Sequence, residues 1–316
     1  RDILQAVQVV DVMDAIEDSM HVYERHEFTM PQRLHVDHEG NTLLLMPCFI
    51  KDYFATKLVT LFPENPERGV PMLNGLVVLN NGRTGEPIAV LDGLTLTALR
   101  TAAVGSVSIR HLAPNDARAV GIVGAGVQGF YQAWLACEAG AITDVYVYDL
   151  YPEKTSALVE RLPQVIPTVT LHRAASVEEL LKRTQIVITA TTSLDPVLPD
   201  NEELLAGKHF VGIGSYKPAV REFPRALYRL IKVVYIDTDH AVEESGDLIV
   251  PLRSGWIKPE QVVTLGRFLS ESKNRDEAKR ETSLFKSVGM ALFDVCASRL
   301  VYENAVRKGL GQQIEL

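Results

Sequence analysis

Three glycines with the spacing Gly-x-Gly-x-x-Gly carry the clearest chemical signal in this chain. Gly124, Gly126 and Gly129 follow a β-prone run over 119–123 and precede a helix-like pattern. In such a turn the first glycine makes the tight bend, the second lets the backbone approach a pyrophosphate, and the third lets helix and strand pack closely. The free N–H groups at the start of the helix then face the phosphates. The spacing predicts a dinucleotide site, and the alternative is a βαβ turn without a ligand.

A carboxylate about 20 residues beyond the last glycine indicates which dinucleotide fits this turn. Asp149 ends a second β-prone run that begins at Val145. In this position a carboxylate accepts a hydrogen bond from the ribose 2′-hydroxyl of NAD and repels the 2′-phosphate of NADP. Leu150 and Tyr151 follow, and Lys154 is the one nearby cation. We therefore expect the protein to prefer NAD(H), with NADP(H) as the alternative.

A polar loop after another β-prone run is a second candidate for contact with a cofactor. Thr191, Thr192 and Ser193 follow the run 186–190. At the carboxyl end of a parallel strand such side chains would lie beside the ribose or the nicotinamide of a dinucleotide. The alternative is a polar loop that contacts no ligand.

Three basic side chains stand where a role at the surface alone is awkward. Lys57 lies within an apolar, strand-like run, Arg100 within a helix of small residues, and Arg33 at the start of a strand. A buried lysine is unfavourable unless an anion accompanies it, and arginine offers a planar fork that matches a carboxylate. Together the three side chains predict a clamp for a carboxylate beside a nicotinamide. The alternative for each is a side chain that ends in water.

The composition excludes several classes of protein. Of the 316 residues, 47% are hydrophobic and 23% charged, as in an ordinary globular protein with a sizeable core. The net charge of −8 disfavours a nucleic-acid partner or an anionic membrane surface. Three separated cysteines favour free thiols in a reducing compartment, and His35 and His38 are expected to be exposed rather than bound to metal. We expect a cytoplasmic protein without a metal ion or a membrane span.

The elements that must position these residues fall into two groups. A helical pattern over 11–28 is followed from Gln32 to Leu91 by short runs of period two, which predict a meandering antiparallel sheet. From residue 113 onward, β-prone runs alternate with helices, the pattern of a parallel sheet covered on both faces. A last helix is expected from Thr282 onward. The expected strands of the second group are 119–123, 145–149, 185–190, 209–213 and 233–236.

These patterns predict an α/β protein with two domains. One is a Rossmann-type, doubly wound dinucleotide-binding domain over 113–286. The other is a strand-rich α+β domain for substrate binding and dimerisation, formed by 1–112 with 287–316. Because its sheet would be left partly uncovered, we expect a homodimer through about residues 1–112 and the last helix.

Several segments, in one order along nearly the whole chain, resemble the ornithine cyclodeaminase/μ-crystallin family of NAD(P)-dependent proteins. They are Met30 to Arg33, Ala55 to Lys57, Leu96 to Ala103, Val123 to Gln128, Gly214 to Pro218 with Arg221-Glu222, Glu244 to Asp247, and Ser287 to Gly289. The resemblance implies a dimer in which the strand-rich domain supplies the substrate pocket and the subunit interface. It also implies that Arg33, Lys57 and Arg100 hold the carboxylate of the substrate. The positions at which the family contacts the dinucleotide are here Thr101, Val127, Gln128, Asp149, Thr191 and Ser287.

One position departs from the cyclodeaminases of that family. They carry an Asp in the segment aligned with Gly214 to Pro218, where this chain has Tyr216. A phenol with a pKa of about 10 is a poor base at neutral pH, so the resemblance favours the reductase-like and dehydrogenase-like members.

The implied function is that of an NAD(P)H-dependent oxidoreductase with a small amino or imino acid as its substrate. It would reduce a small α-imino acid, such as the cyclic ketimine 1-pyrroline-2-carboxylate, or interconvert an α-amino acid and its imino or keto acid. Lys57 would be the catalytic residue, supplying charge and relaying a proton. Two alternatives stay open, namely ornithine cyclodeaminase with bound NAD and a μ-crystallin-like binding protein with little turnover.

Overall fold

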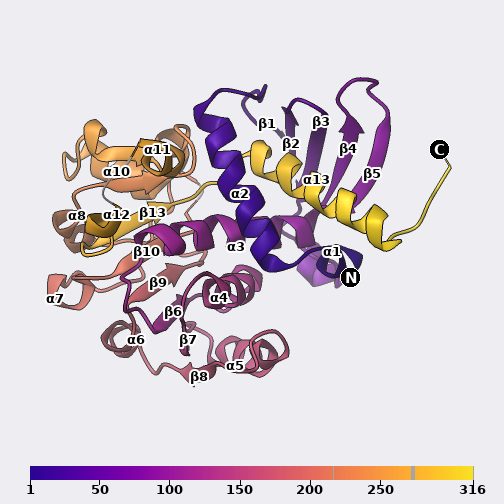
Figure 1. Ribbon diagram of the computed structural model, residues 1–316. Helices are drawn as coiled ribbons and strands as arrows, with labels where there is room; N and C mark the ends of the chain where they lie inside the picture. The colour runs from indigo at the N-terminus through magenta and orange to yellow at the C-terminus, as the bar shows by residue number, and fades with distance from the viewer. Residues whose placement is uncertain (216, 272–274, 316) are drawn as a thin grey trace. The chain divides into compact units, whose positions relative to one another are not determined.

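The computed structural model describes residues 1–215, 217–271 and 275–315, and its chain forms two compact units (Figure 1). The first unit consists of Arg1–Arg100 with Met290–Leu316, and the second of Thr101–Gly289. This division places residues 101–112 with the second unit, whereas the sequence analysis placed them with the first. The limits predicted for the functional domains stay a prediction.

The first unit is built on a five-stranded antiparallel meander in which neighbours in the sequence are neighbours in the sheet. Its strands are β1 (Leu34–His38), β2 (Asn41–Phe49), β3 (Tyr53–Leu61), β4 (Leu73–Asn81) and β5 (Pro87–Asp92). The predicted antiparallel sheet is thereby confirmed. Its helices are α1 (Asp2–Ala6), α2 (Val9–Glu24), the 3-10 turn η1 (Asn65–Arg68) and α13 (Ala291–Lys308).

The two faces of this sheet differ in what covers them. The long helix α13 packs against β2, β3 and β4, and α1 and α2 pack against α13. The side chains on that face, such as Lys57 and Val77, which are paired across β3 and β4, are buried. Alternate positions point to the other face, which leaves apolar side chains exposed there. These are Leu34, Val36, Phe49, Leu76 and Val90.

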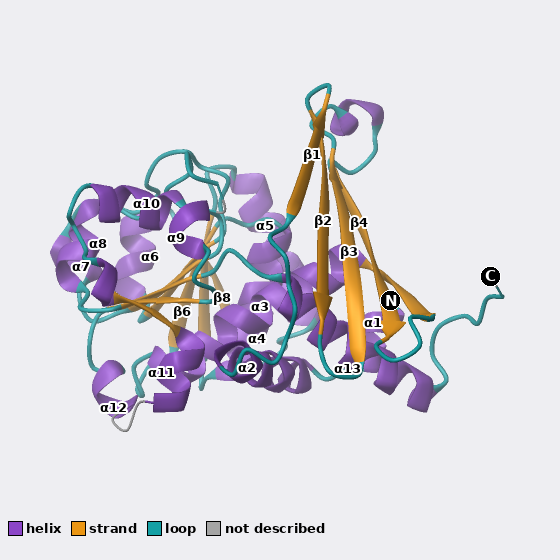
Figure 2. Ribbon diagram, turned by 90° about the horizontal axis from the view of Figure 1, so that it is seen from above, coloured by secondary structure: helices purple, strands orange, loops and turns teal. Residues whose placement is uncertain are grey.

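The second unit is a parallel sheet of eight strands, and Figure 2 shows helices on both of its faces. The strand order is β12-β11-β13-β10-β9-β6-β7-β8. The strands are β6 (Ala119–Val123), β7 (Asp144–Tyr148), β8 (Thr170–Arg173), β9 (Ile186–Thr189), β10 (His209–Gly212), β11 (Val234–Ile236), β12 (Val262–Thr264) and β13 (Ser283–Lys286). This confirms the predicted Rossmann-type α/β fold, and β8 and β12 are strands that the sequence analysis did not assign.

The helices of the second unit connect these strands, after α3 (Gly93–Leu112), which crosses from the first unit. They are α4 (Val127–Ala139), α5 (Pro152–Arg161), η2 (Leu162–Gln164), α6 (Val177–Arg183), α7 (Glu202–Leu205), α8 (Arg225–Leu230), α9 (Ala241–Glu244), α10 (Gly246–Arg253), η3 (Pro259–Gln261), α11 (Leu265–Glu271) and α12 (Arg275–Ala278).

The predicted start of the last helix at Thr282 is wrong. Residues Ser283–Lys286 form β13, which pairs with β10 on one side and β11 on the other, and the helix begins only at Ala291. All the residues of β13 are buried. The periodicity of a short apolar run does not distinguish a strand buried on both faces from a buried helix.

Candidate functional site

The three glycines of the predicted turn occupy the bend between β6 and α4, and each meets a different steric demand. Gly124 has a φ of 106°, and a Cβ there would lie 2.6 Å from the carbonyl oxygen of Ala190. A Cβ on Gly129 would lie 2.1 Å from the carbonyl oxygen of Gly124. A Cβ on Gly126, by contrast, would meet no atom within 4 Å. The backbone at Gly126, which precedes the first turn of α4, is therefore open to a ligand.

Asp149 lies beside this turn, directly after β7. Its Oδ2 accepts a hydrogen bond from the backbone N–H of Ala125 at 2.7 Å, and its Oδ1 accepts one from the N–H of Tyr151 at 3.0 Å. The Nζ of Lys154 lies 4.5 Å from the centroid of the Tyr151 ring, within range of a cation–π contact. The carboxylate is thus fixed at the strand end where a ribose hydroxyl would meet it.

The predicted contact residues at the other strand ends are held by buried carboxylates. Thr191, after β9, donates from its N–H and from its Oγ1 to Glu222 Oε1, both at 2.8 Å. Ser287, after β13, donates from its Oγ to Asp237 Oδ2 at 2.7 Å. Thr101 is buried on α3. The sequence analysis named Glu222 only as part of a family segment and did not name Asp237, because a lone acid has no distinctive spacing.

The helix after the turn offers groups that fit a dinucleotide. The Oε1 of Gln128 is buried, and the described part of the chain gives it no hydrogen-bond partner, a state that native proteins rarely leave unexplained. Val127, one position earlier, is 66% exposed at the start of α4. Together with the open backbone at Gly126, these residues fit a bound pyrophosphate and its flanking sugars. That Thr101, Val127, Gln128, Thr191 and Ser287 contact the dinucleotide stays a prediction.

In the first unit, Lys57 and Arg100 share one carboxylate. The Nζ of Lys57, on β3, lies 3.2 Å from both oxygens of Asp294 on α13. The Nε of Arg100, on α3, lies 2.9 Å from Asp294 Oδ1. All three side chains are buried, with 3%, 5% and 1% of their surface exposed for Lys57, Arg100 and Asp294. We call these three residues the cation cluster, and they carry a net positive charge.

The cluster corrects part of the argument from sequence. Burial of Lys57 is confirmed, but Asp294 provides the anion that this burial requires, so burial alone does not demand a substrate carboxylate there. Asp294 escaped notice because α13 is buried at each position from Ala291 to Val295. A helix without an exposed face at this point gives no amphipathic pattern against which an acid stands out.

The surroundings of Lys57 in the cluster lower its pKa toward neutral pH. Burial lowers the pKa of Lys57 from 10.5 to about 8; Asp294 opposes this shift, whereas Arg100 and Arg33 add to it. Arg33 is half-buried, and its positive charge is the smallest of these effects on the pKa of Lys57. Lys57 is mostly charged at neutral pH and loses its proton in mildly alkaline solution.

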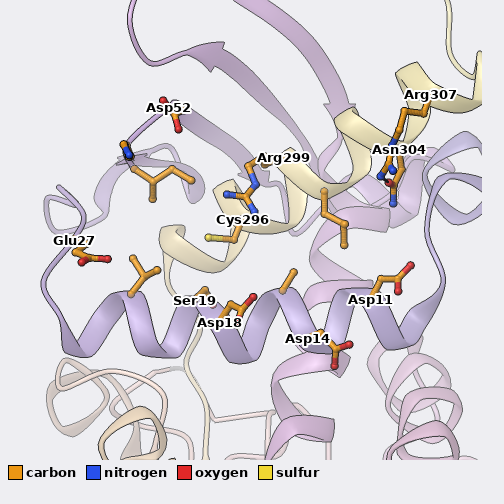
Figure 3. A pocket seen from close by; sticks show the side chains of 15 residues that line it. Asp11, Asp14, Asp18, Ser19, Glu27, Asp52, Cys296, Arg299, Asn304 and Arg307 are labelled. Carbon is orange, nitrogen blue, oxygen red and sulfur yellow. Dashed lines mark hydrogen bonds between the residues drawn. The ribbon is translucent and has the colours of Figure 1, made fainter. Parts of the chain in front are cut away.

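A pocket of about 890 Å³ between α2 and α13 is also found in the first unit (Figure 3). Its charged lining includes Asp14, Asp18 and Glu27 from or just after α2, and Arg299 and Arg307 from α13. Among the described residues that line it there is none of the predicted site residues. It takes no part in the site proposed below.

Comparison with known proteins identifies the family of this chain. The model of the ornithine cyclodeaminase/mu-crystallin family matches residues 1–309. The chain belongs to this family. It is 34% identical to a Delta(1)-pyrroline-2-carboxylate reductase of Bacillus cereus, over 88% of this chain and 86% of that protein.

Two solved structures of high similarity extend the comparison. A Delta(1)-pyrroline-2-carboxylate reductase of Thermococcus litoralis, in complex with NADH and L-proline, has a TM-score of 0.89 and 29% identity over 99% of this chain and 98% of its own. An archaeal alanine dehydrogenase dimer with bound NAD has a TM-score of 0.88 and 27% identity, over 99% of this chain and 97% of its own. The predicted family resemblance and fold are confirmed.

The remaining expectations from the sequence concern Tyr216, two histidines, a metal ion and a membrane span. Tyr216, which replaces the family Asp, lies outside the described residues. His35 and His38 are exposed, as predicted. Within residues 1–215, 217–271 and 275–315, no group of three or more His, Cys, Asp or Glu is placed to hold a metal ion. The helices of those ranges are too short or too polar to cross a membrane.

Proposed function

We propose that the protein is an NAD(P)H-dependent oxidoreductase that reduces a small α-imino acid, a cyclic ketimine such as 1-pyrroline-2-carboxylate, to the amino acid. The observation that carries this proposal is the cation cluster, in which Lys57 and Arg100 share the single carboxylate of Asp294. The named reductases and dehydrogenases among the relatives support the same class of reaction.

The charge of the cluster selects the substrate class. Two buried cations against one buried anion leave an excess positive charge in a region of low dielectric, where an unbalanced charge is costly. A substrate carboxylate would neutralise this excess. It would also accept hydrogen bonds from the N–H groups of Arg100 in a planar arrangement. Arg33, whose charge acts on Lys57, strengthens the attraction for a second anion.

Each of the three basic residues then has a defined task. When bound, the nicotinamide supplies the hydride for the C=N carbon, which is the difficult part of the chemistry. Arg33 and Arg100 orient the substrate carboxylate and so fix the imine in one position. Lys57 holds a proton at its Nζ at neutral pH and, as the catalytic residue, donates a hydrogen bond or a proton to the substrate.

We further propose that NAD(H) is preferred over NADP(H). Asp149 would accept a hydrogen bond from the ribose 2′-hydroxyl and repel a 2′-phosphate. Lys154 lies over the Tyr151 ring, which supports a structural role for that cation rather than a role in binding a phosphate.

The experiment is a panel of cyclic and acyclic imino acids, each mixed with the protein and either NADH or NADPH while the loss of reduced cofactor and the amino acid formed are measured. We expect equal amounts of cofactor oxidised and amino acid formed, with higher kcat/KM for NADH. Release of ammonia from ornithine without net change in NADH would instead indicate a cyclodeaminase. Binding of NADH without either reaction would indicate a binding protein, and both outcomes would contradict the proposal.

A further inference from the structure

Glu222 is a fully buried acid whose carboxylate is surrounded by donors. Oε1 accepts hydrogen bonds from the N–H and the Oγ1 of Thr191, both at 2.8 Å. Oε2 accepts from Thr189 Oγ1 at 3.0 Å and from the N–H of Gly214 at 2.8 Å. An ionised carboxylate accepts about four hydrogen bonds, so these partners satisfy it. One side chain therefore joins the ends of β9 and β10.

The position of these strand ends relative to the glycine turn shows what is being joined. In the sheet, β9 lies between β6 and β10, and β7 lies on the other side of β6. Asp149 at the end of β7 marks the side of the adenosine ribose, so the nicotinamide extends toward β9 and β10. The segment after β9 touches the turn itself, because a Cβ on Gly124 would lie 2.6 Å from Ala190 O.

The surroundings of Glu222 leave little freedom for either segment. A Cβ on Gly214 would lie 2.2 Å from the carbonyl oxygen of Thr191 and 2.5 Å from Glu222 Oε1, so the two segments are in close backbone contact. The backbone of Glu222 is fixed in turn by buried Asp247, whose Oδ1 accepts from the N–H of Glu222 at 2.8 Å and from that of Phe223 at 3.1 Å. The buried carboxylates of Glu222 and Asp247 thus stabilise the chain at the carboxyl ends of β9 and β10.

We propose that Glu222 is a positioning residue that holds the segments after β9 (residues 190–193) and after β10 (residues 213–215) in the conformation that receives the nicotinamide end of the dinucleotide. The glycine turn and Asp149 hold the adenosine diphosphate end without its help. Without the Glu222 carboxylate these segments would have to be ordered at the moment of binding, which weakens binding of the nicotinamide end. The inference rests on the cofactor of the proposed function and is independent of its substrate.

The test compares NADH with ADP-ribose, which contains every part of the cofactor except the nicotinamide. In Glu222→Gln an amide nitrogen replaces one carboxylate oxygen, and the negative charge is removed. Because an amide nitrogen accepts no hydrogen bond, the two donors that now bond to this oxygen lose their acceptor. By isothermal titration calorimetry we expect the Kd for NADH to rise about tenfold to a hundredfold, and the Kd for ADP-ribose to stay within about twofold. Thr189→Val, which removes one donor and nearly keeps the shape, should change the Kd for NADH in the same direction by about threefold.

A control separates positioning from a general loss of stability. His209 is fully buried at the opposite end of β10, with its ring nitrogens 3.0 Å from Ser108 Oγ and 2.8 Å from Ser283 Oγ. His209→Ala should lower the urea midpoint and leave the ratio of the two Kd values unchanged. Equal weakening of NADH and ADP-ribose in Glu222→Gln, or no weakening of either, would overturn the inference. A changed ratio in a protein that reduces no imine would refute the proposed substrate and leave this inference standing.

Discussion

Lys57 shows how one buried residue can set the pH range of a reaction. Its folded-state pKa of about 8 lies below the ordinary value of 10.5 because burial disfavours the ammonium form. If the charged form is the active one, kcat/KM for an imino acid is constant below the pKa and falls as pH rises through about 8. The pH profile of the initial rate measures this, and a basic limb that begins only near the ordinary lysine pKa would contradict it.

Asp294 makes a separate prediction, since it is the carboxylate that Lys57 and Arg100 share. Asp294→Asn leaves two buried cations without a counter-charge, and breaking a buried pair in this way costs about 3–5 kcal/mol of unfolding free energy. Because Asp294 raises the pKa of Lys57, any folded variant should also show its basic limb at lower pH.

Urea unfolding and the pH profile of the same variant test the two consequences of Asp294→Asn. Glu303→Gln is a matched control on the same helix, because Glu303 is partly exposed and bonds Tyr53 at 3.1 Å. It should cost less than about 1 kcal/mol. Equal destabilisation by the two variants would show that the cation cluster contributes no more than a surface contact.

At this scale the sequence predicted the cations better than their partners. Lys57 and Arg100 interrupt apolar runs, and such interruptions are visible in one dimension. Asp294 follows Lys57 by 237 positions, and Glu222 lies 31 positions beyond Thr191, so their pairing depends on tertiary structure that no local pattern encodes. The buried acids are therefore the part of the site that could not be predicted.

At the scale of elements, the glycine turn separates folding from binding. Gly126 has φ and ψ of −82° and −164°, which alanine adopts freely, and its Cβ would enter open space. Gly126→Ala should therefore change the melting temperature by less than about 2 °C. It should weaken the binding of NADH at least about tenfold, since the pyrophosphate needs that space.

Gly129→Ala should instead lower the stability of the folded state. Its Cβ would lie 2.1 Å from Gly124 O, so α4 must move away from β6, and the folded state loses about 1–3 kcal/mol by overpacking. Differential scanning calorimetry and NADH titration of both variants check the pair. Unchanged NADH affinity in Gly126→Ala would show that no ligand approaches this backbone.

Elements were predictable where their periodicity was unambiguous. The antiparallel meander has alternating burial along β3 and β4, and the strand, glycine turn and helix of the nucleotide site have a recognised spacing. The strand β13 was missed because it is buried on both faces between β10 and β11, and it was interpreted as the first turn of the last helix. Local pattern failed where tertiary burial overrides it.

At the scale of the whole molecule, the uncovered face of the five-stranded sheet predicts self-association. Leu34, Val36 and Val90 on that face are 54%, 44% and 59% exposed, and an exposed apolar face of this kind favours a partner. We expect a homodimer by light scattering at micromolar concentration, and Val90→Asp should shift it toward monomer. Leu150→Asp, which changes an exposed leucine of the second unit, is the control and should stay dimeric. A monomeric unmodified protein would contradict the proposed assembly.

The central claim is that the cation cluster serves the reduction of an imino acid by NADH. The most direct measurement is the rate of NADH oxidation with 1-pyrroline-2-carboxylate for the unmodified protein, Lys57→Ala, and Lys51→Ala as an exposed control. Loss of a charge-assisted hydrogen bond costs about 1.5–3 kcal/mol, and loss of a proton donor about 10²–10⁴-fold in rate. We predict that Lys57→Ala binds NADH normally and loses at least about 99% of kcat/KM, while Lys51→Ala retains it. Normal turnover in Lys57→Ala would contradict the account.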